Sequence, residues 1–239
     1  MNKIGNPQSE IKNFRAFTLI ELLTVIAIIS TLAGFTLVVT KPAARMKYVK
    51  TAQAELNQIE IALDNYKAKY GVYPPGNTQT AYASPLTNLL PQLYYELCGT
   101  TNDGVNFVSP DGSSVPIGTV HLYYGASGFI NCSKGGDEDS VKAPNFLPGL
   151  TPKQLYVNWT NIPSVGVPTT ILITSVGGPD QNYHPLNPVD HVGPNPFRYL
   201  YPGVNNPNSY DLWVQLVISG KTNLICNWSK QVQINTSLP

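Results

Sequence analysis

The sequence predicts an α+β fold in which one long N-terminal helix packs on a small antiparallel sheet near the C-terminus. Apolar residues recur at helical spacing through residues 49–70. Residues 195–236 instead hold short β-branched and aromatic runs separated by turn residues. Most of the 19 Gly and 21 Pro follow residue 71, which predicts a loop-rich middle segment over residues 76–194.

Size and charge limit the range of functions. The chain has 239 residues, a net charge of +1 and only 12% charged residues. This length fits one domain with a helical extension. Because the sequence lacks the basic stripe of a nucleic-acid binder, we expect no nucleic-acid partner.

The N-terminal segment consists of a polar leader, residues 1–16, followed by an apolar run. Residues 17–39 carry a single charge, Glu21. A helix of that length covers about 34 Å, enough to cross a bilayer core of roughly 30 Å. We therefore predict a transmembrane helix over residues 17–41. A cleaved secretory signal is a poorer fit, since its apolar region usually spans about 7–15 residues. A plain signal anchor fits the length but leaves Glu21 unexplained.

The heptapeptide at the junction, Arg-Ala-Phe-Thr-Leu-Ile-Glu at residues 15–21, resembles the leader site of type IV pilins and type II secretion pseudopilins. In that family a prepilin peptidase cuts before the Phe and methylates the new N-terminus. The resemblance implies cleavage between Ala16 and Phe17, N-methylation of Phe17, and a role for Glu21 in subunit assembly. The residue before the cut is usually Gly, and here it is Ala16.

Electrostatics gives Glu21 a reason to lie in an apolar segment. In a filament of staggered helices, its carboxylate would face the amine of a neighbouring copy, and opposite charges attract strongly where water is scarce. The alternative interpretation is an interfacial glutamate that reaches the lipid headgroups.

A second helical segment follows at residues 42–71. The Lys41-Pro42 step predicts a kink or a locally melted stretch. An apolar stripe then predicts packing on a sheet of the same chain; it comprises Val49, Ala52, Leu56, Ile59, Leu63, Tyr66 and Tyr70. Gly71 and Pro74-Pro75 end the helix. Residues 62–75 resemble the A-L-x-x-Y … G-x-Y-P pattern of the major pseudopilin.

The remaining residues, 72–239, are expected to form a periplasmic head. Its middle part, an insertion or a family-specific decoration, is predicted to hold a short helix over 85–97, loops over 99–118, and strands over 120–124 and 169–176. Four C-terminal strands are predicted as an antiparallel meander, namely 197–201, 210–219, 222–228 and 231–236. Residues 195–228 resemble the sheet of major pseudopilins but lack its acidic calcium loop, so we expect no metal there.

Candidate reactive residues predict little chemistry. Cys98, Cys132 and Cys226 allow one disulfide plus a free thiol, of undetermined pairing, or three buried thiols. A metal site among four residues of a Pro-rich loop is conceivable but lacks helical ligand spacing; they are Asp180, His184, Asp190 and His191. His121 is interpreted as structural, and no catalytic motif or cofactor is expected.

The sequence thus predicts a non-enzymatic subunit of a type II secretion pseudopilus or a related type IV pilus-like filament. What the resemblance implies is processing by prepilin peptidase, insertion in the bacterial inner membrane as a single-pass protein, and assembly with homologous subunits. The alternative is a membrane-anchored periplasmic binding or adhesion protein that does not polymerise.

Overall fold

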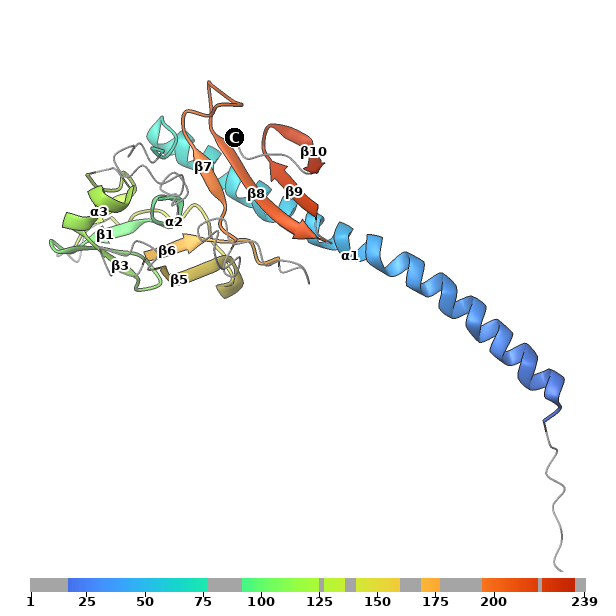
Figure 1. Ribbon diagram of the computed structural model, residues 1–239. Helices are drawn as coiled ribbons and strands as arrows, with labels where there is room; N and C mark the ends of the chain where they lie inside the picture. The colour runs from blue at the N-terminus through green and yellow to red at the C-terminus, as the bar shows by residue number, and fades with distance from the viewer. Residues whose placement is uncertain are drawn as a thin grey trace, which may run out of the picture. The chain divides into compact units, whose positions relative to one another are not determined.

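Figure 1 shows the protein as a computed structural model. The structure describes residues 17–76, 92–124, 127–135, 141–159, 169–176, 195–218 and 221–234; the side chains of 35–44, 121–124, 157–159 and 169 are outside this description. The chain divides into two compact units, Met1–Ala44 and Arg45–Pro239. Each unit is described by itself.

Helix α1 runs from Leu19 to Tyr70 and passes through Pro42 without a break. Of the kink or locally melted stretch predicted at Lys41-Pro42, the melted stretch is therefore wrong. A proline removes only one backbone donor, and the flanking turns keep the helix continuous around that missing hydrogen bond. Within the part of the chain that the structure describes, no helix combines the length and the apolar character that a membrane crossing requires.

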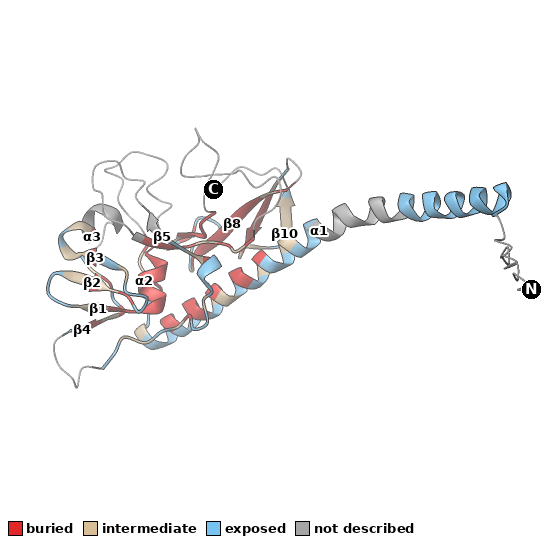
Figure 2. Ribbon diagram, turned by 90° about the horizontal axis from the view of Figure 1, so that it is seen from below, coloured by how far each residue is buried: buried red, intermediate tan, exposed pale blue. Residues whose placement is uncertain are grey.

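In the second unit, α1 buries the predicted apolar stripe. Ala52, Leu56, Ile59, Leu63 and Tyr66 are buried, together with Ala62, in one large hydrophobic cluster, and Val49 and Tyr70 pack against it. Figure 2 shows these buried positions alternating with exposed ones along the helix. The helix ends where Gly71 adopts a φ of 77°, a left-handed conformation that glycine reaches without strain.

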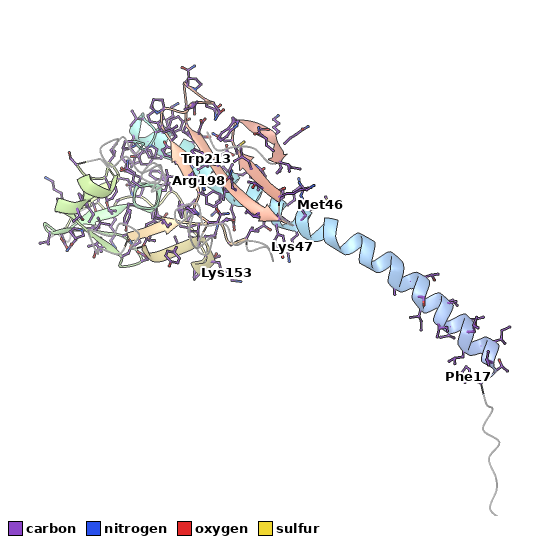
Figure 3. All side chains as sticks on the ribbon, in the orientation of Figure 1. Phe17, Met46, Lys47, Lys153, Arg198 and Trp213 are labelled. Atoms are coloured by element: carbon purple, nitrogen blue, oxygen red, sulfur yellow. The ribbon has the colours of Figure 1, made fainter. Side chains whose placement is uncertain are left out.

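The C-terminal meander is confirmed. Its strands are β7 (Arg198–Leu200), β8 (Asp211–Ile218), β9 (Lys221–Cys226) and β10 (Ser229–Ile234). They form an antiparallel sheet of order β10-β9-β8-β7. Leu212, Val214 and Leu216 of β8 belong to the same cluster as the buried stripe of α1. Trp213 of β8, which Figure 3 labels, forms a second, smaller cluster with the alternate residues Leu224 and Cys226 of β9.

The middle segment contains more regular structure than the sequence predicts. Three strands of a four-stranded sheet of order β3-β2-β1-β4 lie within the segment 99–118, which was predicted as mostly loops. Its strands are β1 (Thr100–Asn102), β2 (Asn106–Val108), β3 (Ser114–Pro116) and β4 (Cys132–Lys134). The turn residues at 102–104 and 109–113 form tight hairpin connections between strands of three residues, too short to show an alternating pattern.

Three further predictions concern the middle segment. The strand predicted over 120–124 is wrong, because Ile117–Tyr124 form helix α3. The helix predicted over 85–97 is observed as α2 (Leu93–Cys98), while 85–91 lie outside the described residues. Strands β5 (Leu155–Trp159) and β6 (Thr169–Leu172) pair antiparallel after the short 3-10 helix η2 (Pro152–Gln154), so the strand predicted over 169–176 is observed in part.

Polar contacts at several heights hold α1 in the second unit. Arg45 Nη2 donates to Asn223 Oδ1 of β9 at 2.8 Å. The buried Glu55 accepts from Thr174 Oγ1 at 2.8 Å, just after β6. Tyr66 Oη donates to Glu96 Oε2 of α2 at 2.9 Å. Because these contacts lie at three heights along the helix, they define its axial position against the sheets.

Candidate functional site

The first turn of α1 is closed by a capping box between Thr18 and Glu21. Thr18 N and Thr18 Oγ1 both donate to Glu21 Oε2 at 2.9 Å, and Glu21 N donates back to Thr18 Oγ1 at 3.3 Å. This reciprocal pattern is typical of a helix N-terminus, because it satisfies amides that have no partner within the helix. Glu21 therefore has a local structural role that the sequence analysis did not assign to it.

The geometry leaves part of the Glu21 carboxylate accessible. Both contacts from Thr18 use the same oxygen, Oε2, and no described residue donates to Oε1. Residues 17–34 contain no Lys, Arg or His, so the carboxylate has no cation on its own segment. Phe17, one residue before the cap, has an exposed fraction of 81%. A negatively charged oxygen is thus presented at the start of an apolar helix.

The side chains around this cap form a continuous exposed apolar surface. Every described side chain from Phe17 to Gly34 is exposed, and the large apolar ones are Phe17, Leu19, Ile20, Leu22, Leu23, Val25, Ile26, Ile28, Ile29 and Leu32. Figure 3 shows such side chains as sticks along the helix that begins after the labelled Phe17. Exposed apolar surface of this extent marks a site that contacts lipid or another protein.

The two described threonines within this helical segment do not need water as a hydrogen-bond partner. Thr24 Oγ1 donates to Glu21 O at 2.9 Å, and Thr31 Oγ1 donates to Ile28 O at 2.8 Å. Because the hydroxyls are satisfied by carbonyls of their own helix, transfer of this surface to an apolar environment leaves their donors paired.

The other predicted site residues fall in several places. Ala16 and the loop residues Asp180, His184, Asp190 and His191 lie outside the described residues. His121 lies in α3 rather than in a strand, and its side chain is not described. Within the described part of the chain, no group of three or more His, Cys, Asp and Glu side chains is placed to hold a metal ion.

All three cysteines are free thiols. Cys98 and Cys226 are buried, and Cys132 is partly exposed. Burial raises the pKa of the Cys98 thiol to about 12, with a smaller contribution from the nearby Asp111. Burial also raises the pKa of Cys226. A buried thiol with a raised pKa is a poor nucleophile, since the thiolate is the reactive form.

Comparison with known proteins identifies the same N-terminal segment. Residues 11–37 match the family model of the prokaryotic N-terminal methylation motif. No curated protein and no solved structure matches the chain. The matched motif is that of type IV pilin-like proteins processed by prepilin peptidase, and it is typical of membrane-anchored proteins that assemble with other pilin-type subunits.

Thr18 is the functional residue that sequence reasoning missed. The signal was present, because Thr-x-x-Glu directly before an apolar run is the sequence signature of a capping box. The structure brings Thr18 and Glu21 together within the matched segment. Any account of Glu21 in assembly must therefore separate its charge from its role as a cap.

Proposed function

We propose that this chain is a structural subunit of a type II secretion pseudopilus or a related type IV pilus-like filament. The observation that carries the proposal is the methylation motif at residues 11–37, which surrounds the Ala16-Phe17 junction and Glu21. In this proposal the chain has no catalytic role and needs no cofactor. Its partners are prepilin peptidase, homologous subunits and the inner membrane.

The proposed assembly begins in the membrane. The apolar run at residues 17–39 inserts as a single helix, with residues 72–239 as a periplasmic head. Cleavage before Phe17 then creates an α-amino group, which the peptidase methylates. In the filament, the Glu21 carboxylate of one subunit pairs with the Phe17 amine of a neighbour.

Two features of the described helix support this pairing. Glu21 Oε1 has no described donor, so one oxygen can receive the amine of a neighbour while Oε2 continues to cap the helix. The exposed apolar residues that follow supply a water-poor contact between helices. In such surroundings an ion pair is stronger than in water, and an unpaired carboxylate is correspondingly unfavourable. The pair would therefore define the axial register of neighbouring subunits.

Two sequence patterns favour a secretion pseudopilus. Residues 62–75 and 195–228 carry patterns that resemble the major pseudopilin. Strands β7, β8 and β9 lie within the second of these ranges as a meander, and buried residues of α1 and β8 share one cluster.

Processing is tested by intact-mass spectrometry of the protein isolated from its native membrane. The proposal expects loss of residues 1–16 and a gain of about one methyl group on Phe17. A chain that retains Met1–Ala16 would contradict processing and would favour the anchored protein that does not polymerise.

The role of Glu21 is tested with three variants. Glu21→Leu removes the charge and both bonds that Glu21 Oε2 accepts, Glu21→Gln removes the charge but keeps an amide oxygen that can cap, and Thr18→Ala removes both bonds of the Thr18 hydroxyl but keeps the charge. If the ion pair directs assembly, both Glu21 variants insert in the membrane but lose association between differently tagged copies, whereas Thr18→Ala still associates. Normal association of Glu21→Gln with loss in Thr18→Ala would assign Glu21 to capping alone.

A further inference from the structure

Glu96 is a fully buried acid at the centre of the second unit. Its exposed fraction is 0%, and it lies on α2 between apolar neighbours. Its carboxylate accepts from three donors: Tyr66 Oη of α1 at 2.9 Å, Ile130 N at 3.0 Å, and Asn131 N at 2.9 Å. The acid therefore joins α1, α2 and the segment that leads into β4.

The described titratable groups that face Glu96 are phenols and a thiol, and none of them is a cation. From α1 come Tyr66 and Tyr70, and from β7 comes Tyr199; burial raises the pKa of all three phenols, and Glu96 adds a smaller contribution. Cys132, on β4, lies beside Tyr70. The hydrogen-bond donors described for the carboxylate are hydroxyl and amide groups, with no cation among them. A charge on Glu96 is thus balanced by dipoles alone.

An irregular segment, residues 141–148, lies against this site and is called the strap below. Phe146 N donates to Leu97 O of α2 at 2.8 Å. The Phe146 ring lies edge-on against Tyr66 and Tyr70, at centroid distances of 5.6 Å and 6.0 Å. The strap therefore rests on the same α1 tyrosine that donates to Glu96.

Asn131 connects the acid to the strap directly. Its Nδ2 donates to Glu96 O at 2.7 Å and to Pro144 O at 2.8 Å, while its Oδ1 accepts from Tyr70 Oη at 2.8 Å. Its backbone amide meanwhile donates to the Glu96 carboxylate. Asn131 therefore bonds both to Glu96 and to the strap at Pro144.

We propose that Glu96 is a proton-operated latch, which in its neutral form favours the closed strap over α1 and α2 and in its charged form favours local opening. The physical basis is the difference between two environments. A charged carboxylate is poorly solvated in the closed interior but well solvated once the strap opens and water enters. Opening that hydrates Glu96 is therefore coupled to loss of its proton.

The direction of the pH effect follows from linkage. Burial raises the pKa of the Glu96 carboxyl above its ordinary value, and the donors from Asn131, Ile130 and Tyr66 oppose that rise without cancelling it. The closed state thus binds more protons than the open state, so its advantage is complete below the ordinary pKa of about 4.3 and is lost as the pH rises through the raised pKa. Between these two values, the opening equilibrium increases by about tenfold per pH unit.

The test is hydrogen exchange measured by mass spectrometry on the full chain in detergent micelles, from pH 4 to pH 8, corrected for the intrinsic exchange rate. Peptides that cover residues 130–132 and 144–148 should lose protection as the pH rises, relative to β8. The loss should persist in Glu55→Gln, a matched change of a second buried glutamate, and should disappear in Glu96→Gln. Equal pH slopes in the wild type and Glu96→Gln would overturn the proposal.

A direct titration decides the matter if Glu96→Gln does not fold. The side-chain carboxyl carbon of Glu96, followed by NMR in the wild-type chain, should titrate above the ordinary glutamate value of about 4.3. A midpoint at or below that value would leave the closed strap without a proton to release and would refute the latch.

Discussion

Replacing Leu63 by alanine tests the central packing of the second unit, which is the burial of one face of α1. Leu63 has an exposed fraction of 0% and lies in the main hydrophobic cluster. Ile61, two residues earlier on the same helix, has an exposed fraction of 63%. The pair provides a matched experiment, because each substitution shortens a four-carbon side chain in one helix and only the burial differs.

The expected magnitude follows from that difference in burial. Leu63→Ala removes buried carbon atoms and leaves a cavity, which typically lowers the free energy of unfolding by 2–5 kcal/mol, and about 3–4 kcal/mol is expected for a site without exposure. For a unit of about 200 residues this lowers Tm by about 6–16 °C. Ile61→Ala loses little buried area and gains helix propensity, so its effect should stay within about 0.5 kcal/mol.

Thermal unfolding of the full chain in detergent micelles, followed by tryptophan fluorescence, measures both variants. Trp213 is buried and Trp228 packs against it, so the signal reports on the second unit. Urea unfolding should show a lower midpoint for Leu63→Ala at an unchanged slope. Equal losses in the two variants, or a larger loss in Ile61→Ala, would refute the assignment of the buried helix face.

Three further predictions concern the second unit. Gly76→Ala should lower the free energy of unfolding by about 1–3 kcal/mol, because its Cβ would lie 2.6 Å from Tyr201 O. The control is Gly118→Ala in α3, whose Cβ would meet nothing within 4 Å, so this change should be neutral or stabilising. Urea unfolding compares the two variants. The buried carboxylate of Asp211 accepts from the backbone amides of Val204, Asn205 and Asn206. Asp211→Asn should therefore lower the free energy of unfolding by about 2–3 kcal/mol and speed limited proteolysis in 203–210. An unchanged cleavage rate would contradict this role of Asp211. Iodoacetamide at pH 8 should label the partly exposed Cys132 well before Cys98. Burial raises the pKa of Cys98 to about 12, which leaves about one thiolate in ten thousand at pH 8, and this fraction rises tenfold per pH unit. Peptide mass spectrometry measures the order in which the two thiols are labelled.

Local patterns were sufficient to predict the second half of α1 and the C-terminal meander. The stripe from Val49 to Tyr70 has a helical period over many turns, and β8 and β9 are long enough to show apolar and β-branched character between turn residues. The strand prediction over 120–124 failed because His121-Leu122-Tyr123-Tyr124 has a composition typical of strands. Helix α3 instead begins directly after Pro116, where Thr119 Oγ1 donates to Pro116 O at 2.8 Å, and it buries Val120.

The sites differ in how far the sequence revealed them. The N-terminal motif is contiguous, so Phe17 and Glu21 were identified from neighbouring residues, and the capping role of Thr18 followed the same local rule although it was overlooked. Glu96 gave no comparable signal. Its donors come from residues 30 to 35 positions away in the sequence, on other elements, and only the folded chain brings them together.

The position of the capping box also bears on what a peptidase would leave behind. A cut between Ala16 and Phe17 removes none of the atoms that join Thr18 to Glu21. Precursor and product can therefore share the same first helical turn, and the new N-terminus is attached to a helix that is already formed. Cleavage would then change the charge at the N-terminal end of α1 without requiring any part of the helix to refold.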